Sequence, residues 1–349
     1  MMHNIFNPFN SMKALTYVKD WRDMISSNII PPPIQISLDL DATCQFNCTF
    51  CNAVEARKRK DTMSLDTIDD IIDLVTFHRF AQSFCVGGGG ESLCNPNFGY
   101  FVDQVYEVAS IGVVTNGMNI DKYLESLLKC KWVGISLDAA TPETYSKLKG
   151  TSKDNFNKVV NNIKLLVDNG HTDVTIKYLI WPDNIREINN AAKIAKELGV
   201  RRFQVRPGDS PWFGKSDSSI YSDYDVRYAR MQMNRAIQLA DNNFEVYIVM
   251  QNFDNKLSRK LDFNRCYAGL FNIIIYPNGD VGLCVDRRGD EDTYLCNIDE
   301  LPKVWGSEEH KEKVANLDLS KCPRCTFRVH NLIFENVVLK DNMYCEFVG

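Results

Sequence analysis

Apolar, β-rich runs alternate with amphipathic helical patterns over the first two thirds of the chain. The runs lie at 34–40, 83–86, 111–115, 132–137, 174–180 and 202–205. The helical patterns between them lie at 65–80, 98–109, 120–128, 155–169 and 185–198. Strands alternating with helices of this length predict parallel strands joined by right-handed crossovers. We therefore expect an α/β fold built on a partial (β/α)6 TIM-type barrel, with its catalytic loops at the carboxyl ends of the strands.

The pattern changes after residue 225. A long helix is expected at 225–241 and a strand at 245–250, and two apolar runs at 272–276 and 281–285 flank a Pro-Asn-Gly-Asp turn that predicts a hairpin. A further helix is expected at 302–316, and another at 12–25, before the prolines of 31–33. We divide the chain into an N-terminal arm (1–33), the partial barrel (34–225), a connector (226–265) and a small C-terminal α+β domain (266–349).

Composition narrows the class of protein. The 349 residues carry a net charge of -5, and 44% are hydrophobic, which is typical of a globular protein without the basic face that nucleic-acid binding requires. No secretory signal and no apolar run of about 18 residues is present, so we expect a cytoplasmic protein with no membrane partner. In a reducing compartment, the clustering among its 12 cysteines indicates metal more often than disulfides.

Three cysteines follow the first predicted strand with the spacing C-x3-C-x2-C: Cys44, Cys48 and Cys51. Three thiolates on one loop can hold three irons of a [4Fe–4S] cubane and leave the fourth iron open to a substrate or cofactor. A zinc site that lacks one ligand, or three buried cysteines, are the alternatives. The position at the end of a barrel strand favours the cluster.

This loop is similar to the signature of the radical S-adenosylmethionine (SAM) superfamily, including the aromatic Phe50 before the last cysteine. The second strand ends in Gly87-Gly88-Gly89-Gly90-Glu91-Ser92, which resembles the family's Gly-Gly-Glu-Pro motif with serine in place of proline. Thr115-Asn116-Gly117 ends the third strand, as in many members. The resemblance implies a partial barrel, a SAM-binding [4Fe–4S] cluster held by the three cysteines, and reductive cleavage of SAM to a 5′-deoxyadenosyl radical.

The resemblance also implies a SAM site at the strand ends. The glycine-rich segment Gly88, Gly89, Gly90 and Glu91 would meet the methionine amino group, and Ser136 on the fourth strand would bind the SAM ribose or carboxylate. Asp138 competes with Ser136 for that role or orients the substrate. Arg206, after the sixth strand, would bind the SAM carboxylate or the substrate, or lie on the surface. Helix capping is the alternative for Ser136 and Asp138.

A second group of cysteines follows in the C-terminal part: Cys266, Cys284, Cys322 and Cys325. The hairpin and the C-x-x-C loop can bring four thiolates together. This pattern resembles SPASM and twitch auxiliary-cluster domains. Because only Cys345 follows Cys325, the resemblance favours the twitch-like form with one auxiliary [4Fe–4S] cluster; a zinc ribbon is the alternative. Cys85, Cys94 and Cys130 read as ordinary buried cysteines, and Cys296 and Cys345 stay unassigned.

The expected activity is hydrogen abstraction from an organic substrate, in a net oxidation of a small molecule or sugar. Peptide crosslinking or epimerisation, methyl transfer, and a non-enzymatic electron carrier are the alternatives. The basic run at 57–60 reads either as a solvated segment or as a docking patch for an acidic electron donor of the flavodoxin or ferredoxin type, or for a phosphate-bearing substrate.

Overall fold

The computed structural model describes residues 11–208, 220–249 and 261–340. Its centre is one ten-stranded sheet with the order β10-β9-β8-β1-β2-β3-β4-β5-β6-β7. The strands are β1 (Gln35–Leu38), β2 (Ser83–Val86), β3 (Ser110–Thr115), β4 (Trp132–Ser136), β5 (Val174–Ile180), β6 (Arg202–Pro207), β7 (Glu245–Ile248), β8 (Asn272–Ile275), β9 (Asp280–Gly282) and β10 (Tyr294–Asn297). Neighbouring strands from β8 through β1 to β7 pair in parallel, and the hairpin strands β9 and β10 pair antiparallel.

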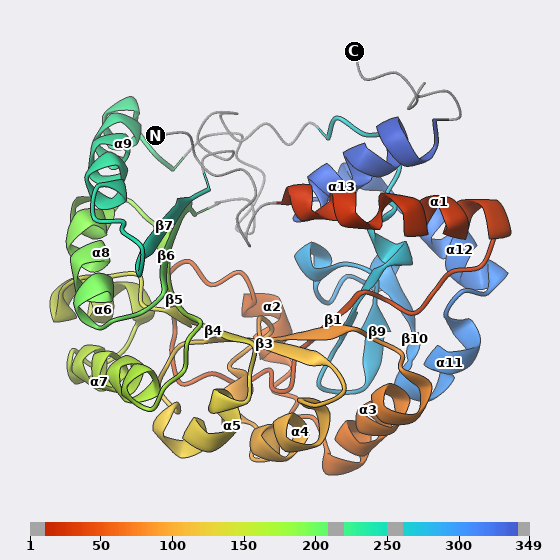
Figure 1. The fold of residues 1–349 in the computed structure, drawn as a ribbon, viewed down its shortest axis with the longest axis horizontal. Helices are drawn as coiled ribbons and strands as arrows, with labels where there is room; N and C mark the ends of the chain where they lie inside the picture. The colour runs from red at the N-terminus through yellow and green to blue at the C-terminus, as the bar shows by residue number, and fades with distance from the viewer. Residues whose placement is uncertain (1–10, 209–219, 250–260, 341–349) are drawn as a thin grey trace.

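The sheet curves like an open horseshoe, and most helices lie on its outer, convex side (Figure 1). The helices are α1 (Val18–Ser27), α2 (Val54–Lys58), α3 (Leu65–His78), α4 (Phe98–Val105), α5 (Leu124–Leu128), α6 (Pro142–Lys149), α7 (Asp154–Asp168), α8 (Ile188–Glu197), α9 (Asp223–Ile237), α11 (Leu301–Val304), α12 (Glu308–Ala315) and α13 (Arg328–Ile333). Their apolar stripes cover the outer face of the strands, where side chains such as Ile36, Leu38 and Val86 are fully buried.

The predicted partial barrel is confirmed, and the sheet is longer than the six strands expected. β7 extends one edge, and β8 extends the other by pairing in parallel with β1, Gln35 opposite Asn272. Sequence periodicity cannot reveal this second pairing because its partners lie 237 residues apart. The division at residue 266 therefore crosses a continuous sheet and stays a prediction about domains. Residues 209–219, before the predicted helix at 225–241, lie outside the described residues, as does Cys345.

The inner face of the strands is unusual for a barrel. Barrel interiors are normally filled by branched apolar side chains, whereas the alternating inward positions here include Ser37, Cys85, Gly112, Lys177 and Gln204. Small and polar side chains leave space and hydrogen-bonding groups in the lumen. The sequence thus forms an open site on the inside of the sheet rather than a second apolar core.

The N-terminal segment packs against the C-terminal helices. Trp21 of α1 is 2% exposed and stacks on Phe271 with ring centroids 5.0 Å apart. The ring centroid of Phe334 lies 4.8 Å from that of Trp21. Arg22 donates a hydrogen bond to the carbonyl oxygen of Val337 at 3.0 Å. Residues 12–25 are helical as predicted, and the structure adds that they close one end of the sheet opening (Figure 1).

Candidate active site

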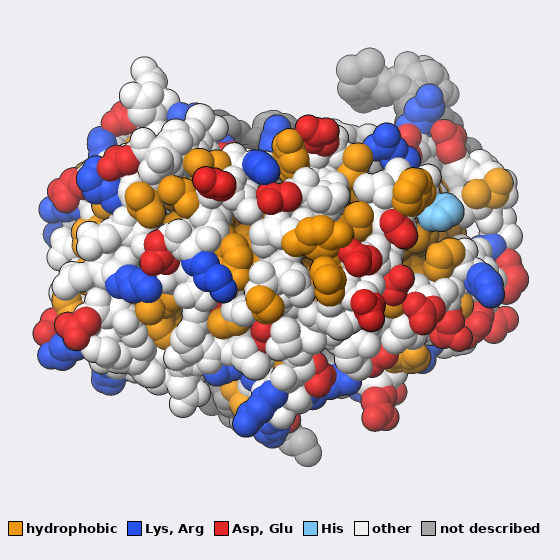
Figure 2. Space-filling view, turned by 90° about the horizontal axis from the view of Figure 1, so that it is seen from below, with side chains coloured by type: hydrophobic (Ala, Val, Ile, Leu, Met, Phe, Trp, Pro, Cys, Tyr) orange, Lys and Arg blue, Asp and Glu red, His pale blue; other side chains and the backbone are white. Residues whose placement is uncertain are grey.

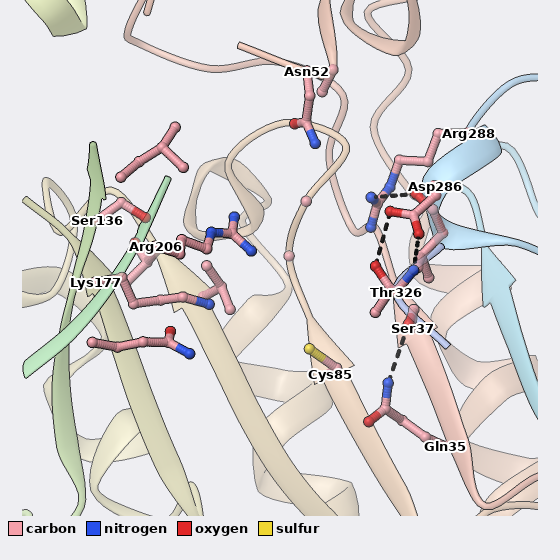
Figure 3. A pocket seen from close by; sticks show the side chains of 18 of the residues that line it. Gln35, Ser37, Asn52, Cys85, Ser136, Lys177, Arg206, Asp286, Arg288 and Thr326 are labelled. Atoms are coloured by element: carbon pink, nitrogen blue, oxygen red, sulfur yellow. Dashed lines mark hydrogen bonds between the residues drawn. The ribbon is translucent and has the colours of Figure 1, made fainter. Parts of the chain in front are cut away.

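A cavity of about 750 Å³ opens on the inside of the sheet at the carboxyl ends of the strands. All three cysteines of the first group line it, together with Gly88, Gly90 and Ser136. None of the four cysteines of the second group lines it. Figure 3 shows one wall formed by Ser136, Lys177 and Arg206, and a facing wall formed by Asp286, Arg288 and Thr326.

The loop that carries Cys44, Cys48 and Cys51 directs N–H donors at its sulfur atoms. The amide of Phe46 lies 3.4 Å from Cys44 Sγ, and Asn116 Nδ2 lies 3.7 Å from the same sulfur. Arg57 Nη1 donates to Cys51 Sγ at 3.7 Å. Such donors stabilise thiolate sulfur in iron–sulfur sites.

The three thiols also lie within electrostatic range of one another. Burial raises the pKa of Cys48 to about 11; nearby Lys149 lowers it, and Asp138, Cys44 and Cys51 add to the rise. Three thiols that disfavour each other's ionisation need a cation to be held as thiolates. The residues present therefore fit an iron cluster, which would supply that positive charge.

The glycine-rich segment is shaped by contacts within the chain. A Cβ added to Gly90 would lie 2.4 Å from the carbonyl oxygen of Asp41 and 2.5 Å from that of Thr43, in the loop that leads to Cys44. A Cβ on Gly89 would lie 2.3 Å from the Asp39 carboxylate, so Gly89 faces Asp39 rather than the large cavity. Gly88 has a φ of +129°, which side-chain-bearing residues avoid. The segment thus lets the second strand end approach the cysteine loop closely.

Glu91 joins this segment to the end of β3. Its carboxylate accepts hydrogen bonds from Thr115 Oγ1 at 2.7 Å, from the Asn116 amide at 2.7 Å and from the Leu93 amide at 3.2 Å. Burial raises the pKa of Glu91, and these donors oppose the rise. The motifs at 87–92 and 115–117 are thus one structural unit, in which Glu91 positions both backbones.

Asp138 is engaged by its own chain as well. It has a left-handed backbone, with φ +58°, and accepts hydrogen bonds from Lys149 Nζ at 2.5 Å and from the Leu179 amide at 2.6 Å. Burial opposes the charge of Lys149, but Asp138 and Cys48 outweigh it, so the pKa of Lys149 is raised. This buried ion pair fixes the loop after β4 beside Cys48, while Ser136 faces the cavity.

Three lining residues show what motif reading misses. Lys177 and Gln204 are neighbours in the register of β5 and β6 and both line the cavity, yet neither belongs to a recognisable motif. Cys85, expected to be an ordinary buried cysteine, instead lines the cavity from β2 (Figure 3). The signal that could have found them is a polar residue at an inward position of an otherwise apolar strand.

Asp286 joins the segments that carry three of the four cysteines of the second group, Cys284, Cys322 and Cys325. Asp286, 1% exposed, accepts hydrogen bonds from Arg324 Nε at 2.7 Å, the Thr326 amide at 2.5 Å and Thr326 Oγ1 at 2.9 Å. The loop after Cys284 is thereby joined to the loop of Cys322 and Cys325.

Electrostatic interactions between the thiols indicate that these cysteines are near one another. Burial raises the pKa of Cys325, and Cys266 and Cys284 add to the rise. Burial likewise raises the pKa of Cys322, where Arg287 opposes the rise and Cys266 adds to it. Asn331 Nδ2 donates to Cys325 Sγ at 3.6 Å. In the part of the chain that the structure describes, no three His, Cys, Asp or Glu side chains are placed to hold a single metal ion.

The basic run divides between the site and the surface. Arg57 lines the cavity and donates to the Phe46 carbonyl oxygen at 2.7 Å. Lys58 pairs with Glu55 in solvent, and Arg59 lies 3.3 Å from Asp61. The face in Figure 2 mixes both signs of charge, and acidic side chains gather toward one end. Among the described residues, no helix is long and apolar enough to cross a membrane.

Comparisons with known proteins agree with this geometry. Residues 42–195 match the model of the Radical SAM superfamily. Over 183 residues the chain is 28% identical to the mycofactocin maturase MftC of Mycolicibacterium smegmatis, covering 50% of this chain and 45% of that protein. It is 25% identical over 185 residues to the GTP 3′,8-cyclase of Alkaliphilus oremlandii, covering 49% and 56%. The matches thus span about half the length of these curated relatives.

Solved structures show the same fold. The structure of Streptococcus suis SuiB bound to the precursor peptide SuiA matches with a TM-score of 0.64 and 17% identity, covering 87% of this chain and 71% of that one. Tagged anSMEcpe with bound AdoMet matches with a TM-score of 0.60 and 17% identity, covering 81% and 83%.

Proposed function

We propose that this chain cleaves SAM reductively and abstracts a hydrogen atom from an organic substrate. The support is the match of residues 42–195 to the model of the Radical SAM superfamily, whose members are enzymes that use a [4Fe–4S] cluster and SAM. The observation that carries the proposal is the placement of Cys44, Cys48 and Cys51 on the wall of one cavity, beside the glycine-rich end of β2. The volume of this cavity, about 750 Å³, is in the range of small-molecule sites.

In this proposal, Cys44, Cys48 and Cys51 hold the cluster, and its open iron binds SAM. The bound cofactors supply the 5′-deoxyadenosyl radical. The chain supplies position and charge: donors such as Asn116 and Arg57 face the thiolate sulfurs. Ser136 and Gly88 line the space left for SAM, and Glu91 and Asp138 hold the two loops around it.

We propose that Cys266, Cys284, Cys322 and Cys325 hold one auxiliary [4Fe–4S] cluster in a twitch-like C-terminal domain. Four thiolates leave no iron open, so this cluster would carry electrons rather than bind substrate. In a net oxidation, the substrate loses a hydrogen atom to the radical, then a proton and an electron. The auxiliary cluster would accept that electron.

We favour a small molecule or sugar as substrate because several polar side chains line the inner part of the cavity. Gln35 Nε2 lies 3.4 Å from Ser37 Oγ, and Gln204 and Asn272 line the same region. A peptide-modifying reaction is the second candidate, supported by the similarity of the fold to SuiB, whose structure contains a precursor peptide. A cytoplasmic location and a flavodoxin- or ferredoxin-type electron donor complete the proposal.

The test is product analysis on anaerobically reconstituted protein with SAM and dithionite. Release of 5′-deoxyadenosine is expected, and it should disappear in a variant in which Cys44, Cys48 and Cys51 are all alanine. S-adenosylhomocysteine with a methylated product would instead indicate methyl transfer. A protein that binds iron and SAM but releases neither product would contradict the proposal and favour an electron carrier.

A further inference from the structure

The cavity is positively charged in a chain that is negative overall. Its lining holds seven Lys and Arg residues and three Asp and Glu residues, whereas the whole chain has a net charge of -5. Each of the three carboxylates is engaged by donors of the chain itself: Glu91 by Thr115, Asp138 by Lys149, and Asp286 by Arg324. Among the described residues that line it, the cavity therefore offers cations to a ligand and no available carboxylate.

Most of these cations bind groups of the chain itself. Lys149 and Arg324 bind Asp138 and Asp286, and Arg288 Nε lies 2.9 Å from Asp39 Oδ2. Lys177 differs: among the described residues no carboxylate forms an ion pair with its ammonium group, although the charge of Asp138 acts on it from farther away. Figure 3 shows Lys177 extending from β5 into the cavity, alongside Arg206 from β6.

Lys177 is the register neighbour of Ser136 on β4, and both side chains line the cavity. Lys177 is in the middle of β5, next to Gln204 of β6 in the register, whereas Arg206 lies nearer the carboxyl end of its strand. The inner part of the cavity is also rich in amide groups. Asn272, 1% exposed, lines the cavity, and its Nδ2 has no hydrogen-bond partner. A buried donor without a partner costs free energy, which a ligand acceptor would recover.

We infer that the substrate presents an acidic group, a carboxylate or a phosphate, to the inner part of the cavity, where Lys177 is its counter-ion. This inference rests on the proposed function, since it names the class of substrate for the same site. An anion stabilises a desolvated ammonium group that has no ion-pair partner among the described residues. Consistent with this, burial and the nearby Arg206 lower the pKa of Lys177 to about 8.

The test measures anion binding separately from turnover. Reconstituted, SAM-loaded protein is titrated calorimetrically with inorganic phosphate and, in a second arm, with succinate. Because SAM fills its own site, the probe must find another. We expect one of the two anions to bind, which identifies the acidic group. Lys177→Met should weaken that binding tenfold or more, Lys177→Arg should restore most of it, and Lys158→Met, a change at an exposed lysine, should have no effect.

Three results would overturn the inference: binding of neither anion, equal binding by the wild type and Lys177→Met, or a tenfold loss of SAM affinity in Lys177→Met with anion binding intact. The last result would assign the lysine to SAM. If Lys177→Met does not fold, acetylation of Lys177 in the wild type, followed by mass spectrometry, replaces it: the bound anion should slow labelling, and unchanged labelling would refute the inference. Failure of the proposed function appears independently, as absence of 5′-deoxyadenosine.

Discussion

The two groups of cysteines differ in their relation to the cavity. Cys44, Cys48 and Cys51 come from one continuous loop and line it, whereas Cys266, Cys284, Cys322 and Cys325 come from separated segments and do not. In the proposed function, three ligands beside open space would leave an iron available for chemistry, while four ligands would enclose the second cluster. The difference teaches that the same residue type can build a reaction site or an electron-transfer site, depending on ligand number and access.

The buried ion pairs beside the two groups of cysteines differ as well. Beside the first group, Asp138 and Lys149 form an ion pair in which both side chains are under 5% exposed. Beside the second group, Asp286 is equally buried, but its partner Arg324 is 29% exposed. Breaking the pair of Asp138 and Lys149 should therefore cost more free energy, because the charge of the remaining partner would have no access to water.

The largest effect is expected from removal of the first group. Changing Cys44, Cys48 and Cys51 to alanine should abolish 5′-deoxyadenosine formation and lower the iron content from about eight to about four per chain. Iron analysis and chromatography of the products measure the two effects. Cys130→Ala, a change at a buried cysteine outside the cavity, is the matched control and should keep all the iron. Unchanged turnover in the triple variant would show that these three cysteines do not hold the cluster that cleaves SAM.

Removal of half of the second group should separate the two roles. The variant with Cys322→Ala and Cys325→Ala should lose about four irons and still form 5′-deoxyadenosine, because the first loop is intact. Oxidised product should fall by about a hundredfold, since the substrate radical lacks an electron acceptor. Circular dichroism checks that the variant is folded. A folded variant with normal product would show that the second group has a structural role only.

The secondary-structure elements and the first cysteine loop could be predicted from the sequence, whereas most of the cavity lining could not. Strand positions were predictable because apolar alternation is local, and Cys44, Cys48 and Cys51 were predictable because their spacing is short. The pairing of Arg288 with Asp39 was not, because it joins residues 249 positions apart. Lys177 was missed because an inward lysine looks like any polar residue until the curvature of the sheet is known.

A third prediction compares the loss of stability when each of the two ion pairs is broken. Asp138→Asn keeps a residue that tolerates the left-handed backbone but leaves Lys149 buried without its counter-ion, so the free energy of unfolding should fall by about 3–5 kcal/mol. Asp286→Asn should cost less, about 2 kcal/mol, because Arg324 can reach water. Anaerobic urea titrations compare both with Asp103→Asn, a change in an exposed pair. An equal loss for both would contradict the difference in burial.

The smallest effect concerns the hairpin turn that precedes Cys284. Gly279 has a φ of +83°, and an added Cβ would lie 3.3 Å from Asn297 Nδ2, so Gly279→Ala must strain the backbone but needs little repacking. We expect a loss of about 1 kcal/mol, with iron content and 5′-deoxyadenosine formation unchanged. Gly170→Ala is the matched control: its φ is +93°, and nothing lies within 4 Å of the added Cβ.

The two glycine variants should therefore lose similar stability in the same urea titration, because the backbone strain is the same at both positions. Loss of about four irons from Gly279→Ala alone would show that the turn of the hairpin positions the second group of cysteines. The two groups of cysteines would then differ less, because each would depend on a nearby glycine. For the first group this is Gly90, where an added Cβ meets backbone atoms of residues 41–43, and for the second it is Gly279. Retention of the iron would instead locate the support of the second group in Asp286 and its hydrogen bonds to Arg324 and Thr326.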